Sequence, residues 1–145
     1  MNTKHKIRVL IVDDSAVARR AISEALSQDP EIEVIDVACD AYVAREKILK
    51  LQPDVITLDL EMPRMDGLET LRALKADPRT RSLPVVMMTS SREEGDLVAS
   101  YALGVNSYIV EPVDFEHFAE TVAQVGMYWV LANQAPPVAN PAISP

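Results

Sequence analysis

Five short runs of apolar, largely β-branched residues recur along this chain, and a segment with helical spacing follows each of them. The runs cover residues 7–12, 33–38, 54–58, 84–88 and 107–110. Runs of this length, bounded by Pro, Asp or Gly, predict buried strands. Strands that alternate with helices imply a parallel sheet with helices on both faces. We therefore predict an α/β fold built on a doubly wound, five-stranded parallel sheet.

The segments between the runs carry helix signals. Apolar residues repeat at helical spacing in the first three segments, in the rows Ala18, Ile22 and Leu26, then Ala44, Ile48 and Leu51, then Leu68, Leu71 and Leu74. The first row predicts a helix over residues 16–28. The second predicts a helix that begins after the capping residue Asp40, and the third predicts a helix over residues 67–76 with Asp66 as its N-cap. Ser91 and Glu94 form a capping-box pattern for a fourth helix, which ends near Gly104.

Acidic residues stand where two of the predicted strands end. Asp13 and Asp14 follow the first strand, and Asp59 follows the third. The carboxyl ends of strands in an open parallel sheet are where ligands bind. Three carboxylates in one crevice repel one another unless a cation lies among them, and Mg²⁺ takes oxygen ligands of this kind. The sequence therefore predicts a magnesium site at this edge of the sheet.

Composition limits the classes of partner. The 145 residues suit one domain, with 48% hydrophobic and 25% charged residues. A net charge of −8 argues against binding to nucleic acid or to an anionic membrane surface. There is no apolar run of membrane-spanning length and no signal-peptide pattern. The single Cys39 allows no internal disulfide, so we expect a cytoplasmic protein.

The last predicted helix starts near Asp114 and has an unusual apolar end. Its inward face carries Phe115, Phe118, Val122, Val125 and Trp129, and from Gly126 onward the sequence is apolar nearly all round. This surplus either covers a partner, such as a second copy, or packs against the domain's own strands, and the two interpretations carry equal weight. We expect residues 1–132 to form the domain and the Pro-rich residues 133–145 to form a flexible tail.

Several motifs occur together at the predicted strand ends. They are Val12-Asp13-Asp14-Ser15, the stretch from Asp59 to Gly67, Met88-Thr89-Ser90, and Tyr108 in the fifth strand. With them, residues 6–125 resemble the response-regulator receiver domain of two-component signalling. The resemblance implies a flavodoxin-like sheet with strand order 2-1-3-4-5. The first half is similar to the receiver of the chemotaxis methylesterase, and the second half to stand-alone regulators of phytochrome-type histidine kinases.

The resemblance also implies roles at the acidic edge. Asp59 is expected to accept a phosphoryl group from a sensor histidine kinase or phosphotransfer protein. Asp13, Asp14, Asp59 and the backbone carbonyl of Glu61 are the implied Mg²⁺ ligands. The cation is needed because the attacking carboxylate and the phosphoryl group are both anionic. This is phosphotransfer and dephosphorylation chemistry on the protein itself, and we do not expect an enzyme.

Two further residues are implied to convert phosphorylation into a signal. Thr89 would hydrogen-bond a phosphoryl oxygen, and Tyr108 would then turn from an exposed to a buried position. The surface formed by the fourth helix, fifth strand and fifth helix would change and meet a downstream protein target. A single-domain response regulator is therefore the expected function, with a homodimer through the last helix as a further expectation.

One residue departs from the family pattern. Glu111 stands where the family has a lysine, before Pro112. Glu111 either turns outward toward Arg64 or Arg92, or adds a ligand to the metal, or marks a protein that has lost phosphorylation. The last case gives the alternative function, a phosphorylation-independent docking or dimerisation module.

Overall fold

The structure is a computed structural model that describes residues 6–62, 65–89, 93–110, 115–128 and 130. Strands and helices alternate within these residues, as the sequence predicts. The elements are β1 (Ile7–Val12), α1 (Ala16–Ser27), β2 (Ile32–Ala38), α2 (Ala41–Leu51), β3 (Val55–Asp59), α3 (Gly67–Ala76), β4 (Val85–Thr89), α4 (Glu94–Ala102), β5 (Ser107–Val110) and α5 (Phe115–Met127).

The strands form one parallel sheet in the order β2-β1-β3-β4-β5. This confirms the predicted fold class and the strand order implied by the family resemblance. β1 and β3 are neighbours, and Val12 lies opposite Leu58 in their register. Because the strands are parallel, the carboxyl ends of β1 and β3 meet at the same edge of the sheet.

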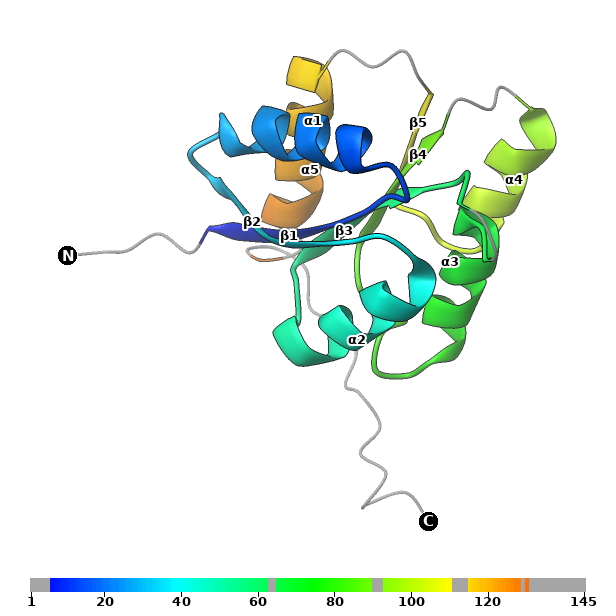
Figure 1. Ribbon diagram of the computed structural model, residues 1–145. Helices are drawn as coiled ribbons and strands as arrows, with labels where there is room; N and C mark the ends of the chain where they lie inside the picture. Colours follow the sequence, from blue (N-terminus) through cyan, green and yellow to red (C-terminus); the bar gives the residue numbers. More distant parts are fainter. Residues whose placement is uncertain (1–5, 63–64, 90–92, 111–114, 129, 131–145) are drawn as a thin grey trace.

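Helices cover both faces of the sheet (Figure 1). On one face, α1 and α5 contribute apolar side chains to a core cluster, namely Ile22, Leu26, Phe118 and Val122. On the other face, α2 and α3 contribute Ala44, Ile48, Leu71 and Leu74. Buried side chains of β1 and β3 alternate between the two clusters, so both faces of these strands are apolar.

Three helices begin at the residues that the sequence predicts. The side chains of Ser15, Asp40 and Asp66 accept hydrogen bonds from the backbone N–H three residues ahead. Such caps satisfy N–H groups that have no partner within the helix. The N–H of Ser15 bonds to the Asp13 carboxylate, and the N–H of Gly67, next to Asp66, donates to the carbonyl of Leu60, so α1 and α3 both start next to the acidic edge.

The start of α4 corrects the predicted capping box. The helix begins at Glu94 with Glu93 as N-cap, and Glu93 makes no side-chain cap hydrogen bond, whereas Ser91 and Arg92 lie outside the described residues. Glu94 and Asp96 place negative charge in the first turn, which stabilises the helix N-terminus without a side-chain cap. The predicted end is confirmed, because Gly104 has φ +88° and its N–H donates to the carbonyl of Tyr101.

The last helix uses its predicted apolar face against its own sheet. Phe118 and Val122 are buried in the cluster with α1. At Gly126 the helix comes so close to the sheet that a Cβ atom would lie 2.3 Å from Ile7 Cγ2. Tyr128, beyond this contact, is 63% exposed. Packing against the domain's own strands thus accounts for the face as far as Gly126, while a homodimer through this helix stays a prediction.

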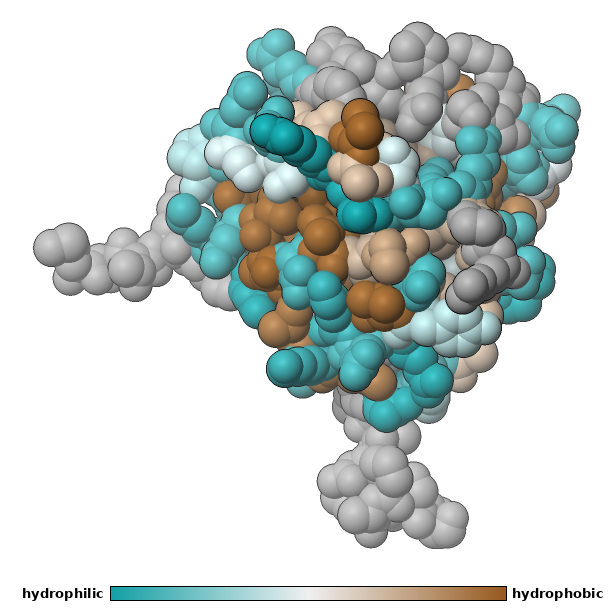
Figure 2. Space-filling model, viewed as in Figure 1, coloured by the Kyte–Doolittle hydropathy of each residue, from teal (hydrophilic) through white to brown (hydrophobic). Residues whose placement is uncertain are grey.

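Figure 2 shows the molecule from the side of Figure 1, coloured by hydropathy. Apolar side chains gather near the middle of this view, where β2 forms the edge of the sheet and its residues Val34, Ile35 and Val37 are partly buried. A hollow of about 460 Å³ lies between α2 and α3, lined in part by Ala41 and Leu74. The acidic residues at the strand ends do not line it.

Among the described helices, none has the length and hydropathy needed to cross a membrane.

Candidate functional site

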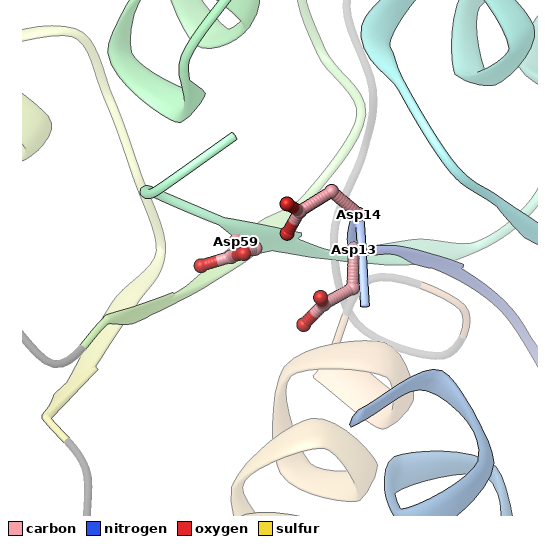
Figure 3. Close-up of side chains that lie close together, drawn as sticks. All are labelled: Asp13, Asp14 and Asp59. Carbon is pink, nitrogen blue, oxygen red and sulfur yellow. The ribbon is translucent and has the colours of Figure 1, made fainter. Parts of the chain in front are cut away.

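Three aspartates converge at the carboxyl edge of the sheet. Asp13 and Asp14 follow the last residue of β1, and Asp59 is the last residue of β3. One carboxylate oxygen of each lies within 4.8 Å of the others. Figure 3 shows the three side chains close together at the strand ends. The three predicted metal-ligating side chains are therefore brought together. The cause is the register of β1 and β3, which places both strand ends at the same level of the sheet.

Backbone N–H groups hold two of these carboxylates in place. Asp13 is 5% exposed, and its Oδ1 accepts a hydrogen bond of 2.9 Å from the N–H of Ser15. Asp59 is half-buried, and its Oδ1 accepts a bond of 3.1 Å from the N–H of Glu61. Asp14 is exposed to solvent. The cluster thus has a buried side at Asp13 and an open side at Asp14.

The electrostatics of the cluster disfavour a third negative charge. Burial, and after it the neighbouring carboxylates of Asp13 and Asp14, together raise the pKa of Asp59 to about 7, against the opposing hydrogen bond from the Glu61 N–H. A divalent cation among the oxygens would reverse this effect by favouring the ionised form. Closely spaced carboxylate oxygens are the donor set of a hard divalent cation, so these residues fit Mg²⁺.

A buried hydroxyl stands at the end of the next strand. Thr89 ends β4, is 0% exposed, and its Oγ1 donates a hydrogen bond of 3.3 Å to Oε1 of Glu61. From the sequence, only the backbone carbonyl of Glu61 is predicted to take part, and this side-chain contact is not predicted. No local signal reveals it, because the two residues lie at the ends of different strands.

Of the two remaining predicted site residues, Tyr108 and Glu111, the structure describes only Tyr108. Tyr108 lies on β5 opposite Met87, packs against the core cluster formed with α2 and α3, and has a buried hydroxyl oxygen. The ring is therefore turned inward in this structure. Glu111, with its neighbour Pro112, lies outside the described residues.

Comparison with known families now decides what kind of domain carries this edge. The model of the response regulator receiver domain matches residues 9–123. The chain belongs to this family. The sequence-based resemblance is confirmed, and the aspartate cluster lies in the matched part of this receiver domain.

Individual relatives come from two kinds of protein. The receiver is 48% identical over 118 residues to a protein-glutamate methylesterase/protein-glutamine glutaminase of Hydrogenovibrio crunogenus, a match covering 79% of this chain and 31% of that protein. The response regulator domain of Thermotoga maritima CheB superposes with a TM-score of 0.73 at 32% identity, over 83% of this chain and 96% of that one. The phosphorylated cyanobacterial phytochrome response regulator RcpA gives 0.72 at 29% identity, over 91% and 99%.

The share of each relative that this chain covers limits which of the relative's properties can be compared with it. The receiver spans about a third of the curated methylesterase that it matches, so that enzyme's activity does not extend to this chain by similarity. It covers almost the whole of the two solved receiver structures. Chemotaxis and phytochrome regulators are thus both among the relatives, and each of the two structures matches more than four fifths of this chain, so the predicted division into two halves stays a prediction.

Proposed function

We propose that this receiver is a phosphorylation-switched signalling protein in which Asp59 is the phosphoacceptor. The observation that carries the proposal is the convergence of the Asp13, Asp14 and Asp59 carboxylates within 4.8 Å at one sheet edge. The similar RcpA is known in a phosphorylated form, which supports the same chemistry here.

The transfer would proceed by attack of an Asp59 carboxylate oxygen on the phosphorus of a phosphohistidine. The new O–P bond gives an aspartyl phosphate, the P–N bond breaks, and the donor imidazole keeps the electron pair. Asp13, Asp14, Asp59 and the backbone carbonyl of Glu61 would hold Mg²⁺. When bound, the cation neutralises charge between the acceptor and the phosphoryl oxygens.

Thr89 and Tyr108 would transmit the event. The Thr89 hydroxyl, now donating to Glu61, would donate to a phosphoryl oxygen instead. Tyr108 sits on β5 beside β4, so a shift of the Thr89 end of β4 reaches its ring. The neighbouring helix α4 exposes Val98 and Tyr101, which offer a downstream protein an apolar contact. The signal would therefore leave through the face formed by α4, β5 and α5.

The proposed phosphoryl donor is a histidine kinase or a histidine phosphotransfer protein. A homodimer through the end of α5 is a further proposal. The homodimer is supported by Tyr128, which is exposed beyond the last sheet contact of the helix. We also propose a cytoplasmic location, because histidine kinases and phosphotransfer proteins present their phosphohistidine in the cytoplasm.

A beryllofluoride titration in the presence of Mg²⁺ tests the phosphoacceptor role. This phosphoryl analogue should perturb the backbone amide signals of Asp59, Glu61 and Thr89 in NMR spectra of the wild-type protein. Asp59→Asn should remove the response, and Asp54→Asn, a carboxylate at the opposite end of β3, is the matched control that should keep it. A wild-type protein that does not respond at saturating reagent contradicts the role.

Glu111 supports one second candidate, a docking module that works without phosphorylation. A carboxylate at the usual lysine position removes a positive charge and adds a negative one near the acceptor. In that case Glu111→Lys would restore the response to beryllofluoride that the wild-type protein lacks. A strong wild-type response leaves the phosphorylation switch as the function.

A further inference from the structure

Arg19 reaches from α1 back to the residue that anchors the cation site. Its Nη1 donates a hydrogen bond of 2.8 Å to the backbone carbonyl oxygen of Asp13. The Asp13 N–H donates to the carbonyl of Ala38 on β2, and the Asp13 carboxylate accepts from Ser15. Asp13 is thus held through its amide nitrogen, its carbonyl oxygen and its side chain.

The neighbouring arginine shows that this placement is not a general property of α1. Arg20 directs its guanidinium to Glu24 one turn ahead, at 3.1 Å, and its side chain is 83% exposed. Arg19 is half-buried and turns toward the strand ends instead. A guanidinium offers several donors in a fixed plane, so it can hold a carbonyl in one orientation.

We propose that Arg19 is a positioning residue that sets the affinity of the aspartate cluster for a divalent cation. This inference rests on the proposed function, because it gives Arg19 a role in holding the cation that phosphotransfer needs. The hydrogen bond fixes the peptide that carries Asp13, so the Asp13 carboxylate is already positioned when a cation arrives.

Groups that hydrogen-bond to metal-ligating residues, without touching the metal, have measurable effects on metal affinity. Loss of such a partner weakens metal affinity by about 10–100-fold. Arg19 bonds to the backbone of a ligand-bearing residue rather than to the ligand oxygen, so we expect the lower end, about tenfold. A bond that only tied α1 to β1 would change the stability of the fold and leave the affinity for the cation unaltered.

The test compares four proteins: wild type, Arg19→Met, Arg19→Lys and Arg20→Met. Met keeps the apolar stem of the side chain and removes the charge and the donors, which preserves the contacts of α1. The dissociation constant for Mg²⁺ is read from the NMR shifts of the Asp13, Asp14 and Glu61 amides. The free energy of unfolding of each protein is measured in EDTA, away from the cation.

Arg19→Met should weaken Mg²⁺ binding about tenfold, Arg19→Lys should recover most of the loss, and Arg20→Met should bind as wild type does. If wild type binds Mg²⁺ and Arg19→Met binds it within twofold of wild type, the inference about Arg19 is overturned while the proposed function stands. If Arg19→Met does not fold, wild-type affinity in a folded Arg19→Gln protein has the same meaning. If wild type itself shows no Mg²⁺-dependent shifts at these amides, the metal site of the proposed function is overturned first.

Discussion

The hydroxyl of Thr89 donates a hydrogen bond to the Glu61 carboxylate across the edge of the sheet, with Oγ1 and Oε1 3.3 Å apart. Thr89 is the residue proposed to meet a phosphoryl oxygen, so the Glu61 side chain uses the donor that the phosphoryl group needs. Glu61 also brings a negative charge to the place where an anion must arrive. Both effects should work against phosphorylation.

Glu61→Ala is therefore expected to tighten beryllofluoride binding in Mg²⁺ by several-fold, since the interaction of a solvent-exposed charge such as that of Glu61 is worth up to about 1 kcal/mol. The backbone carbonyl of Glu61 stays in place in this variant. The affinity is measured by NMR titration, with Glu46→Ala on the exposed face of α2 as a control for the loss of one negative charge. Equal affinities for wild type and Glu61→Ala would show that the Thr89 contact offers no resistance.

The raised pKa of Asp59 predicts that stability depends on pH in the absence of metal. The pKa is about 7 in the folded chain against the ordinary value of 3.8, because of burial and the adjacent carboxylates. Between these values the folded state binds more protons than the unfolded state, so the free energy of unfolding falls as pH rises through 7. Urea unfolding in EDTA should give higher stability at pH 5 than at pH 8. Asp59→Asn should be more stable than wild type at pH 8 and should flatten the profile.

Gly126 predicts a large effect from a single methyl group. A Cβ atom there would lie 2.3 Å from Ile7 Cγ2 and 3.1 Å from Val55 Cγ2. Gly126→Ala should destabilise the fold by about 1–3 kcal/mol, because α5 must move off the sheet. Gly95 in α4 is the matched control, since a Cβ atom there would meet nothing within 4 Å. Gly95→Ala should stabilise by about 0.5–1 kcal/mol in the same urea experiment. Similar values for both variants would contradict the close approach of α5.

Thr57 carries a buried hydroxyl two residues before Asp59, the proposed phosphoacceptor. It is 1% exposed, and its Oγ1 has no hydrogen-bond partner within the part of the chain that the structure describes. Thr57→Val keeps the shape and removes the polar atom, so it should stabilise the protein by about 1 kcal/mol.

Thr80 offers the opposite case as a control for Thr57. Its Oγ1 donates a hydrogen bond of 2.7 Å to the carbonyl of Leu74, and the residue is 3% exposed. Thr80→Val should destabilise by about 1–3 kcal/mol, because it leaves a carbonyl without its donor. Both values come from chemical unfolding curves. A destabilised Thr57→Val would show that its hydroxyl does have a partner.

The sequence predicted those features that arise from local signals or from a repeating pattern. Alternating strand and helix patterns define the doubly wound sheet, and Asp40 and Asp66 mark helix starts through their own side chains. The aspartates could be placed together because parallel strands end at the same edge. The predicted start of α4 is wrong. The Ser91–Glu94 pattern predicts a start before Glu94, whereas the helix begins at Glu94 with acidic residues in its first turn.

The contacts that sequence reasoning missed connect separate elements. Thr89 to Glu61 spans 28 residues, and Arg19 to Asp13 joins a helix to the peptide before it. Neither depends on residue type alone, since Arg20 has the same side chain as Arg19 and a different partner. These contacts follow from the assembled geometry, which neither periodicity nor motif spacing contains.

The pairing of Val12 with Leu58 has a consequence for handling the protein. A slip of one residue between β1 and β3 would turn one set of acids to the opposite side of the sheet. Under the proposed function, only chains whose central strands have assembled correctly would show a magnesium-dependent signal. The fraction of a purified sample that responds to the cation would thus count its properly folded molecules.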